Sequence, residues 1–244
     1  MCAVFAAWIQ LVISFWVTLH FIRMVAYHGN ALSEYIRTCL AFHISNDQDF
    51  GFHPYTTWST TTGRNAQLLI REHGLGEYEL LGVIRTYQTR HGYGPFPTED
   101  PAYAHIDNDH NGTGIHQGAF RRGHLDLPAL RYAIDACGGI DGLVVTHNDV
   151  ADSNHLYLAD SISAEYRFGG HPDDLIAREL HTHHVSNASY QLLTNAGQQV
   201  RASAETIAEC LNVTLVLTGH GPAIPAARWH ANQPSARTPA RVTG

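Results

Sequence analysis

The sequence contains no lysine, because all 15 of its basic residues are arginine. A chain without lysine offers neither the lysine of a phosphate-binding loop nor a lysine that forms a Schiff base. Any phosphate must then be bound by arginine, by backbone N–H groups or by helix ends. The formal net charge of −7 also lacks the positive excess of a nucleic-acid-binding protein, so we expect no nucleic-acid partner.

Cysteine is scarce, and no two cysteines have the spacing of a metal or redox motif. The four are Cys2, Cys39, Cys137 and Cys210. Such scattered cysteines are typical of buried thiols in a reducing compartment, which favours a cytoplasmic location. Charged residues make up 15% of the chain and apolar residues 44%, so most of the chain is expected to be globular.

Charge is missing altogether from residues 2–22, and Arg23 ends this apolar run. A helix of that length would cross a bilayer, at about 1.5 Å per residue. Three interpretations stay open: a membrane anchor, a buried amphipathic helix, or a non-native leader from a misplaced start, a frameshift or a truncation. We therefore divide the chain into a leader (1–48), a globular domain (49–233) and a disordered tail (234–244), which is rich in Pro, Ala and Arg.

Helical and strand-like patterns alternate along the middle of the chain. Apolar spacing predicts helices over 67–73, 127–137 and 204–211, with Asp126 as N-cap of the second. Short apolar, β-branched runs predict strands over 82–87, 142–146 and 213–218. This alternation predicts an α/β fold with a mostly parallel sheet and helices on both faces, preceded by an apolar N-terminal helix.

Histidine is abundant, with 18 residues, and the densest group is His181, His183 and His184. Neutral imidazole is a good ligand for zinc or nickel. However, no cysteine lies near the group, and its spacing matches no metalloenzyme motif. A solvated loop or helix end explains the group equally simply, and we predict no metal site.

Polar residues follow two of the predicted strands, where α/β sheets bind their ligands. The first stretch, after strand 142–146, contains His147, Asn148 and Asp149, and the second, after strand 213–218, contains Gly219, His220 and Gly221. The carboxylate of Asp149 could accept two hydrogen bonds from a guanine edge, or it could merely cap the next turn.

Two further loops have unusual composition. Residues 89–99 hold two Gly and two Pro, which fix the backbone path, and Arg90 stands where an anion could dock. Residues 114–123 form a Gly-rich loop that ends in Arg121 and Arg122. Paired arginines suit a carboxylate or a phosphate, although a solvated pair on a loop would look the same.

These features, in this order, resemble the adenylosuccinate synthetase family. Residues 86–99 read TYQTRHGYGPFPTE, close to the family's AYTTRVGAGPFPTE. Similar stretches are 51–57 (GFHPYTT, like GTYPFVT), 123–133 (GHLDLPALRYA, like GWLDLVALRYA) and 145–150 (VTHNDV, like LTKLDV). Gly221 and Pro222 resemble a late STGP turn. The family joins IMP to L-aspartate in purine nucleotide biosynthesis, with GTP and Mg²⁺ as cofactors.

The resemblance assigns roles to three groups of residues. IMP would be bound by Thr57, Arg90, His91 and Gly92. The aspartate loop would contain His116, Gln117, Gly118, Arg121 and Arg122. GTP would be bound by His147, Asn148, Asp149, Gly219, His220 and Gly221. The resemblance also implies that two chains pair as a homodimer.

The chain departs from the family pattern in ways that bear on activity. The family's phosphate loop, its catalytic Asp and His and its EGAQG segment precede the matched region and are absent from residues 1–48. The resemblance thus implies an incomplete P-loop-type ligase fold without Mg²⁺ ligands or catalytic residues, inactive as an isolated chain. The alternative is a non-catalytic purine nucleotide-binding protein, with or without a membrane anchor.

The substrate-binding positions also differ from the family. In a gapless alignment, Gly118 and Phe120 occupy the places of the two arginines that bind aspartate, so Arg121 and Arg122 could replace them only if the loop shifts. His147 replaces the guanine-reading lysine, and His91 replaces a valine. The resemblance is therefore compatible with another small carboxylate, or another nucleotide, as substrate.

Overall fold

A computed structural model gives the fold of most of the chain. It describes residues 36–41, 44–58, 60–72, 78–106, 118–162, 166, 174–221 and 226–230. The apolar segment 2–22, the tail 234–244 and residues 116–117 lie outside these ranges. Within them, no helix is long and apolar enough to cross a membrane.

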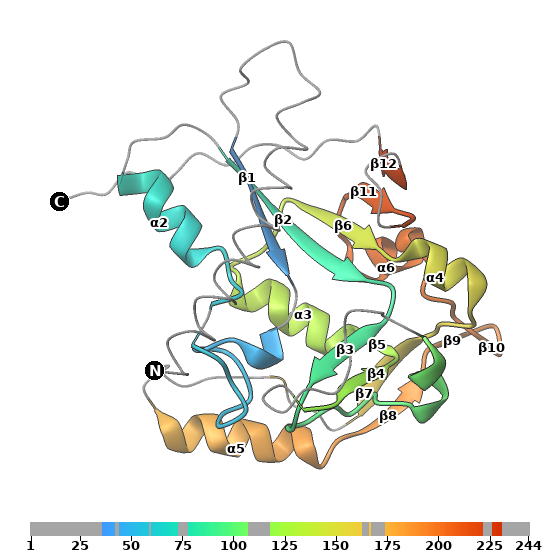
Figure 1. Cartoon of the computed structure of the whole chain (residues 1–244), viewed down its shortest axis with the longest axis horizontal. Helices are drawn as coiled ribbons and strands as arrows, with labels where there is room; N and C mark the ends of the chain where they lie inside the picture. Colours follow the sequence, from blue (N-terminus) through green and yellow to red (C-terminus); the bar gives the residue numbers. More distant parts are fainter. Residues whose placement is uncertain are drawn as a thin grey trace, which may run out of the picture.

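The centre of the fold is a five-stranded sheet with the order β1-β2-β6-β11-β12 (Figure 1). The strands β1 (Ile36–Ala41), β2 (Tyr78–Arg85), β6 (Gly142–Thr146) and β11 (Leu215–Gly219) are parallel to their neighbours. Only the edge strand β12 (Ala227–Trp229) is antiparallel. The predicted α/β fold with a mostly parallel sheet is confirmed. The sheet includes β1, which lies in the stretch that we expect to be a leader, and the domain boundaries stay a prediction.

The sequence of β6 explains its central place. Leu143, Val144 and Val145 are 0%, 1% and 0% exposed, so the strand is buried on both faces. Leu143 and Val145 belong to the main core, which includes residues of α3 (Leu127–Ala136) and α6 (Ala204–Leu211). Val144, on the opposite face, packs in a smaller cluster with Val216 of β11.

Three smaller sheets and three other helices complete the described fold (Figure 1). Antiparallel β3 (Gln88–His91) and β4 (Phe120–Gly123) form the first sheet. The second contains β5 (Leu125–Asp126), β7 (Leu158–Ile162) and β8 (Ser189–Leu192), and the third contains β9 (Thr194–Asn195) and β10 (Gln198–Gln199). The helices are α2 (Arg64–Glu72), α4 (Asn148–Ser153) and α5 (Leu175–Ser186), with 3₁₀ turns η1 (Ile44–Asn46) and η2 (Pro101–His105).

Most predicted elements are present, with shifts that have physical causes. β6 and α6 have the predicted bounds. β2 ends at Arg85 instead of residue 87, because the chain bends at Thr86 and Tyr87 after a last bond from the Thr86 N–H to the Thr146 carbonyl, at 3.2 Å. Asp126 precedes α3 as predicted, but its side chain caps no N–H group and instead accepts a hydrogen bond from the Tyr166 hydroxyl.

The histidine group lies in α5, which the sequence analysis did not predict as a helix. Asp174 caps this helix by accepting a hydrogen bond from the Ala177 N–H, at 3.0 Å. His181 is buried, whereas His183 and His184 are exposed. Across the described ranges, no group of three or more His, Cys, Asp or Glu side chains could hold a metal ion.

Candidate nucleotide site at the carboxyl edge of the sheet

The carboxyl ends of β2, β6 and β11 lie side by side, as parallel strands require. Arg85 at the end of β2 is in register with Thr146 at the end of β6. Asn148 joins β6 to β11, because its amide donates to the Val145 carbonyl at 2.8 Å and to the Gly219 carbonyl at 3.1 Å. The two polar stretches found in the sequence are thus held against each other.

Side-chain hydroxyls fix the turn that follows β2. The Thr86 hydroxyl donates to the His147 carbonyl at 2.9 Å, and the Thr146 hydroxyl donates to the Ile84 carbonyl at 2.9 Å. Since the two bonds run in opposite directions between the strands, they lock the end of β2 to the end of β6. This edge is therefore rigid before any ligand binds.

His147 occupies a special backbone position at this edge. Its φ of 62° is left-handed, and the residue is the N-cap of α4. Burial, and next the Arg85 cation, lower the pKa of His147 to about 4, so the ring is neutral at pH 7. The rings of His147 and Tyr87 pack edge to face, with their centroids 5.8 Å apart.

Arg90 is the centre of the loop that follows β3. Its side chain is buried, with 3% of the residue exposed, and it donates to three backbone carbonyls. The acceptors are Tyr93 at 2.9 Å, Ser45 at 3.4 Å and Tyr55 at 3.0 Å. Burial, and next the neighbouring Arg121, lower the pKa of Arg90 to about 10, so it stays charged at neutral pH. Arg90 thus organises the loop from inside.

Arg121 fixes the same loop from β4. It forms a two-pronged ion pair with Glu99, in which its Nε lies 2.9 Å from each carboxylate oxygen. Its Nη1 donates to the carbonyls of Gly92, at 3.1 Å, and Gly94, at 2.8 Å. The loop after β3 is therefore held between two guanidinium groups.

The predicted IMP loop and aspartate loop touch each other. The Gly92 N–H donates to the Ala119 carbonyl at 2.9 Å. A Cβ atom on Gly118 would lie 2.9 Å from the Gly92 Cα, so the two backbones approach as closely as glycine permits. The His91 ring packs on Phe120, with centroids 4.7 Å apart.

The remaining described members of these two groups lie at the rim of the loops. Thr57 is exposed, and its N–H and hydroxyl both donate to the Asn46 carbonyl, at 2.9 Å and 3.0 Å. The Arg122 guanidinium lies over the Phe120 ring, 4.5 Å from its centroid. Its Nε is buried and has no hydrogen-bond partner among the described residues.

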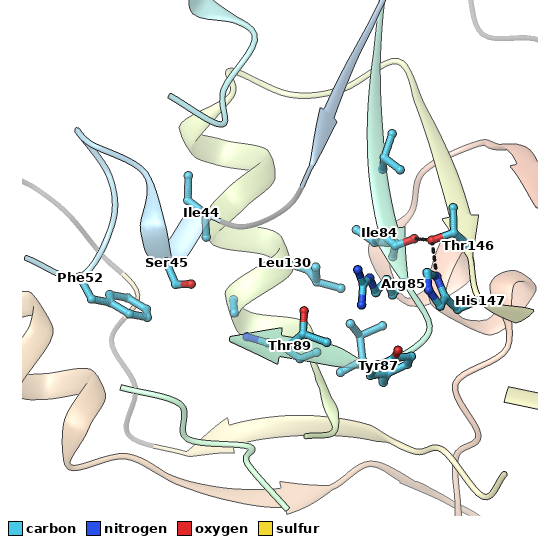
Figure 2. A pocket seen from close by; sticks show the side chains of 14 residues that line it. Ile44, Ser45, Phe52, Ile84, Arg85, Tyr87, Thr89, Leu130, Thr146 and His147 are labelled. Carbon is cyan, nitrogen blue, oxygen red and sulfur yellow. Dashed lines mark hydrogen bonds between the residues drawn. The ribbon is translucent and has the colours of Figure 1, made fainter. Parts of the chain in front are cut away.

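A cavity of about 250 Å³ opens beside the edge of the sheet (Figure 2). Arg85, Thr146 and His147 line it on one side, and Phe52 and Leu130 lie on the other. An apolar hollow with a few convergent polar groups has the usual character of a small-molecule site. Of the residues predicted to bind a nucleotide, only His147 lines this cavity.

A second cavity, of about 410 Å³, is lined by Asn148 and His220. The predicted GTP residues therefore divide between two hollows, and the described residues Asp149, Gly219 and Gly221 belong to the lining of neither. Asp149 is exposed in the first turn of α4. The structure brings the predicted segments together at one edge, but their individual roles stay predictions.

Comparison with known proteins shows the family of this chain. The family model for adenylosuccinate synthetase matches residues 41–222. The chain belongs to the adenylosuccinate synthetase family. An adenylosuccinate synthetase from Babesia bovis is 42% identical over 89 residues, which cover 35% of this chain and 20% of that protein. One from Francisella tularensis subsp. novicida is 35% identical over 107 residues, covering 43% and 25%.

A solved structure extends the likeness to the fold. A fully ligated adenylosuccinate synthetase from Plasmodium falciparum superposes with a TM-score of 0.53 at 22% identity, covering 77% of this chain and 48% of that one. The match confirms the α/β architecture. Because the chain spans only 20–25% of the two curated adenylosuccinate synthetases, catalysis and substrates are matters for proposal.

Gly94 provides a test of the two-arginine loop. Its φ is 110°, and a Cβ atom there would lie 2.3 Å from the Arg90 guanidinium. We expect Gly94→Ala to lower the free energy of unfolding by about 2–4 kcal/mol, from backbone strain plus displacement of Arg90. Gly197→Ala is the control, because φ is also positive there (80°) but nothing lies within 4 Å. Urea denaturation measures both, and equal losses would contradict the role given to Arg90.

Proposed function

We propose that this chain contains the nucleotide-recognising region of an adenylosuccinate synthetase-type ligase, which joins IMP to L-aspartate with GTP. Family membership over residues 41–222 is the observation that carries the proposal. It is supported by the close packing of Gly92 on Gly118, because a nucleotide and a carboxylate bound by these two loops would then be neighbours.

The geometry favours some of the expected contacts over others. Arg90 and Arg121 already donate to carbonyls and to Glu99, so they shape the proposed IMP loop. The proposal leaves the contacts with IMP to His91 and Gly92. Arg122 has a buried Nε with no described acceptor and is the better candidate for binding a carboxylate. The proposal therefore gives the aspartate carboxylate to Arg122.

The guanine base of GTP is assigned to the edge formed by β6 and β11. The exposed carboxylate of Asp149 can accept hydrogen bonds from N–H groups, and His147 and Gly219 flank it. GTP would supply phosphoryl transfer to the substrate. The described residues do not fit a magnesium site, so no step of the proposal passes through the metal.

Location and assembly belong to the same proposal. A cytoplasmic enzyme that pairs as a homodimer is what family membership favours. Attachment to a membrane through residues 2–22 is the alternative, and it concerns a segment outside the described ranges.

The 244-residue chain by itself should make no adenylosuccinate. It contains no lysine, and therefore lacks the phosphate-loop side chain that phosphoryl transfer in this type of fold requires. The measurement is mass spectrometry of a mixture of the pure chain with IMP, aspartate, GTP and Mg²⁺. Steady formation of adenylosuccinate would contradict this expectation.

Calorimetry tests recognition separately from catalysis. We expect the chain to bind GDP, and Asp149→Ala to weaken binding about tenfold or more, because hydrogen bonds to a charged group are lost. Asp135→Ala is the control, since Asp135 is also an exposed helical aspartate but lies on α3. If both variants bind GDP as tightly as the parent chain, Asp149 does not read the base.

A further inference from the structure

Arg85 is a charged group that no role described so far explains. It ends β2, and its guanidinium extends into the 250 Å³ cavity near Thr146 and His147 (Figure 2). Its Nη1 is buried, and no acceptor for it exists among the described residues. A buried donor of a charged group that lacks a partner destabilises a protein. The guanidinium lies 5.9 Å from the centroid of the Tyr87 ring and forms no hydrogen bond or ion pair with a described residue, so its donors on the cavity side are left for a ligand.

The charge of the cavity favours an anion. No Asp or Glu is among the described residues that line it. The imidazole of His147 is neutral at pH 7, because burial and next the Arg85 cation lower its pKa to about 4. Arg85 is therefore the single charge among the described residues of the cavity wall, and it is positive.

Two polar groups next to Arg85, those of Thr146 and His147, are already engaged. The Thr146 hydroxyl donates to the Ile84 carbonyl at 2.9 Å, so its oxygen can accept from the Nδ1–H of His147, at 3.1 Å (Figure 2). In this tautomer, neither group offers a proton to a ligand. A phosphate needs several donors, whereas a carboxylate needs one guanidinium and can be bound by two parallel hydrogen bonds.

Apart from Ser45, Gln88 and Thr89, most of the remaining wall is apolar. Ile84, Leu125 and Leu130 face the cavity, and these side chains belong to the main core. Apolar surface next to a single cation suits a small molecule with an acid group at one end and a hydrocarbon body. Free phosphate would leave this apolar surface uncovered.

We propose that the cavity beside β2 binds a small monocarboxylate with an apolar body, and that Arg85 binds its carboxylate. This site differs from the aspartate loop, whose described members Gly118, Arg121 and Arg122 do not line the cavity. It requires neither IMP nor GTP. The proposal therefore stands or falls independently of the proposed ligase function.

Benzoate is a suitable probe, and the uncharged benzamide is its match in shape. With the full 244-residue chain, calorimetry should give a dissociation constant for benzoate of about 1 mM or tighter. Benzamide and inorganic phosphate should each bind at least about tenfold more weakly, because benzamide lacks the negative charge and phosphate lacks the apolar body. Absence of benzoate binding up to about 20 mM, or equal binding of the three compounds, would overturn the proposal.

Substitution of Arg85 tests whether its guanidinium binds the carboxylate of benzoate. Arg85→Gln should weaken benzoate binding about tenfold or more, and Arg85→Lys should give an intermediate loss, because lysine keeps the charge but not the two-pronged geometry. Arg71→Gln is the control, as Arg71 lies exposed on α2 and outside this cavity. Benzoate binding by Arg85→Gln at the affinity of the parent chain would rule out Arg85 as the anion-binding residue.

The pKa of His147, followed by NMR in the parent chain, gives a readout that requires no substitution. Benzoate bound at Arg85 in the parent chain should raise this pKa, because it places a negative charge next to the ring and offsets the Arg85 cation. Benzamide should leave it unchanged. An unchanged pKa in saturating benzoate would place the carboxylate elsewhere and contradict the proposal.

Discussion

The buried guanidinium of Arg90 is the interaction on which the candidate site depends. It joins three separate segments through the carbonyls of Ser45, Tyr55 and Tyr93. A buried charge is tolerated only when hydrogen bonds replace its water, and here backbone oxygens do so. The loop after β3 is therefore set by Arg90 from within and by Arg121 from the adjacent strand. Together they hold Gly92 against Gly118, so one unit contains both segments to which the proposal assigns substrates.

The central sheet was predictable because its sequence pattern is local. The apolar run of β6 and the amphipathic α6 have the predicted bounds. The small sheets could not be predicted, because their strands are short and depend on partners distant in the sequence, as when Gln88 pairs with Gly123. α5 was missed for a related reason: its apolar residues Leu175, Ile176 and Leu180 are exposed, so its sequence has no clear buried stripe.

The positions of the binding segments were predictable, but the tasks of single residues were not. Arg90 was expected to face an anion, and the structure shows its donors on carbonyls, whereas Arg85 extends into a cavity. Arg85 ends β2 and Arg90 is the next-to-last residue of β3, so sequence alone does not separate them. The strand register does, because it places Arg85 beside Thr146 at the edge of the central sheet. The local signal that could have pointed to Arg85 is a single cation at the end of the run LLGVI.

The central claim is that the turn after β2, the loop after β3 and the start of α4 form one recognition edge. Hydrogen exchange of the 244-residue chain, with and without IMP and GDP, tests it most directly. The account predicts that the nucleotides slow exchange in residues 86–94 and 146–149 together, and leave helix α6 unchanged. Protection that appears in only one of these segments, or that falls mainly on α6, would contradict it.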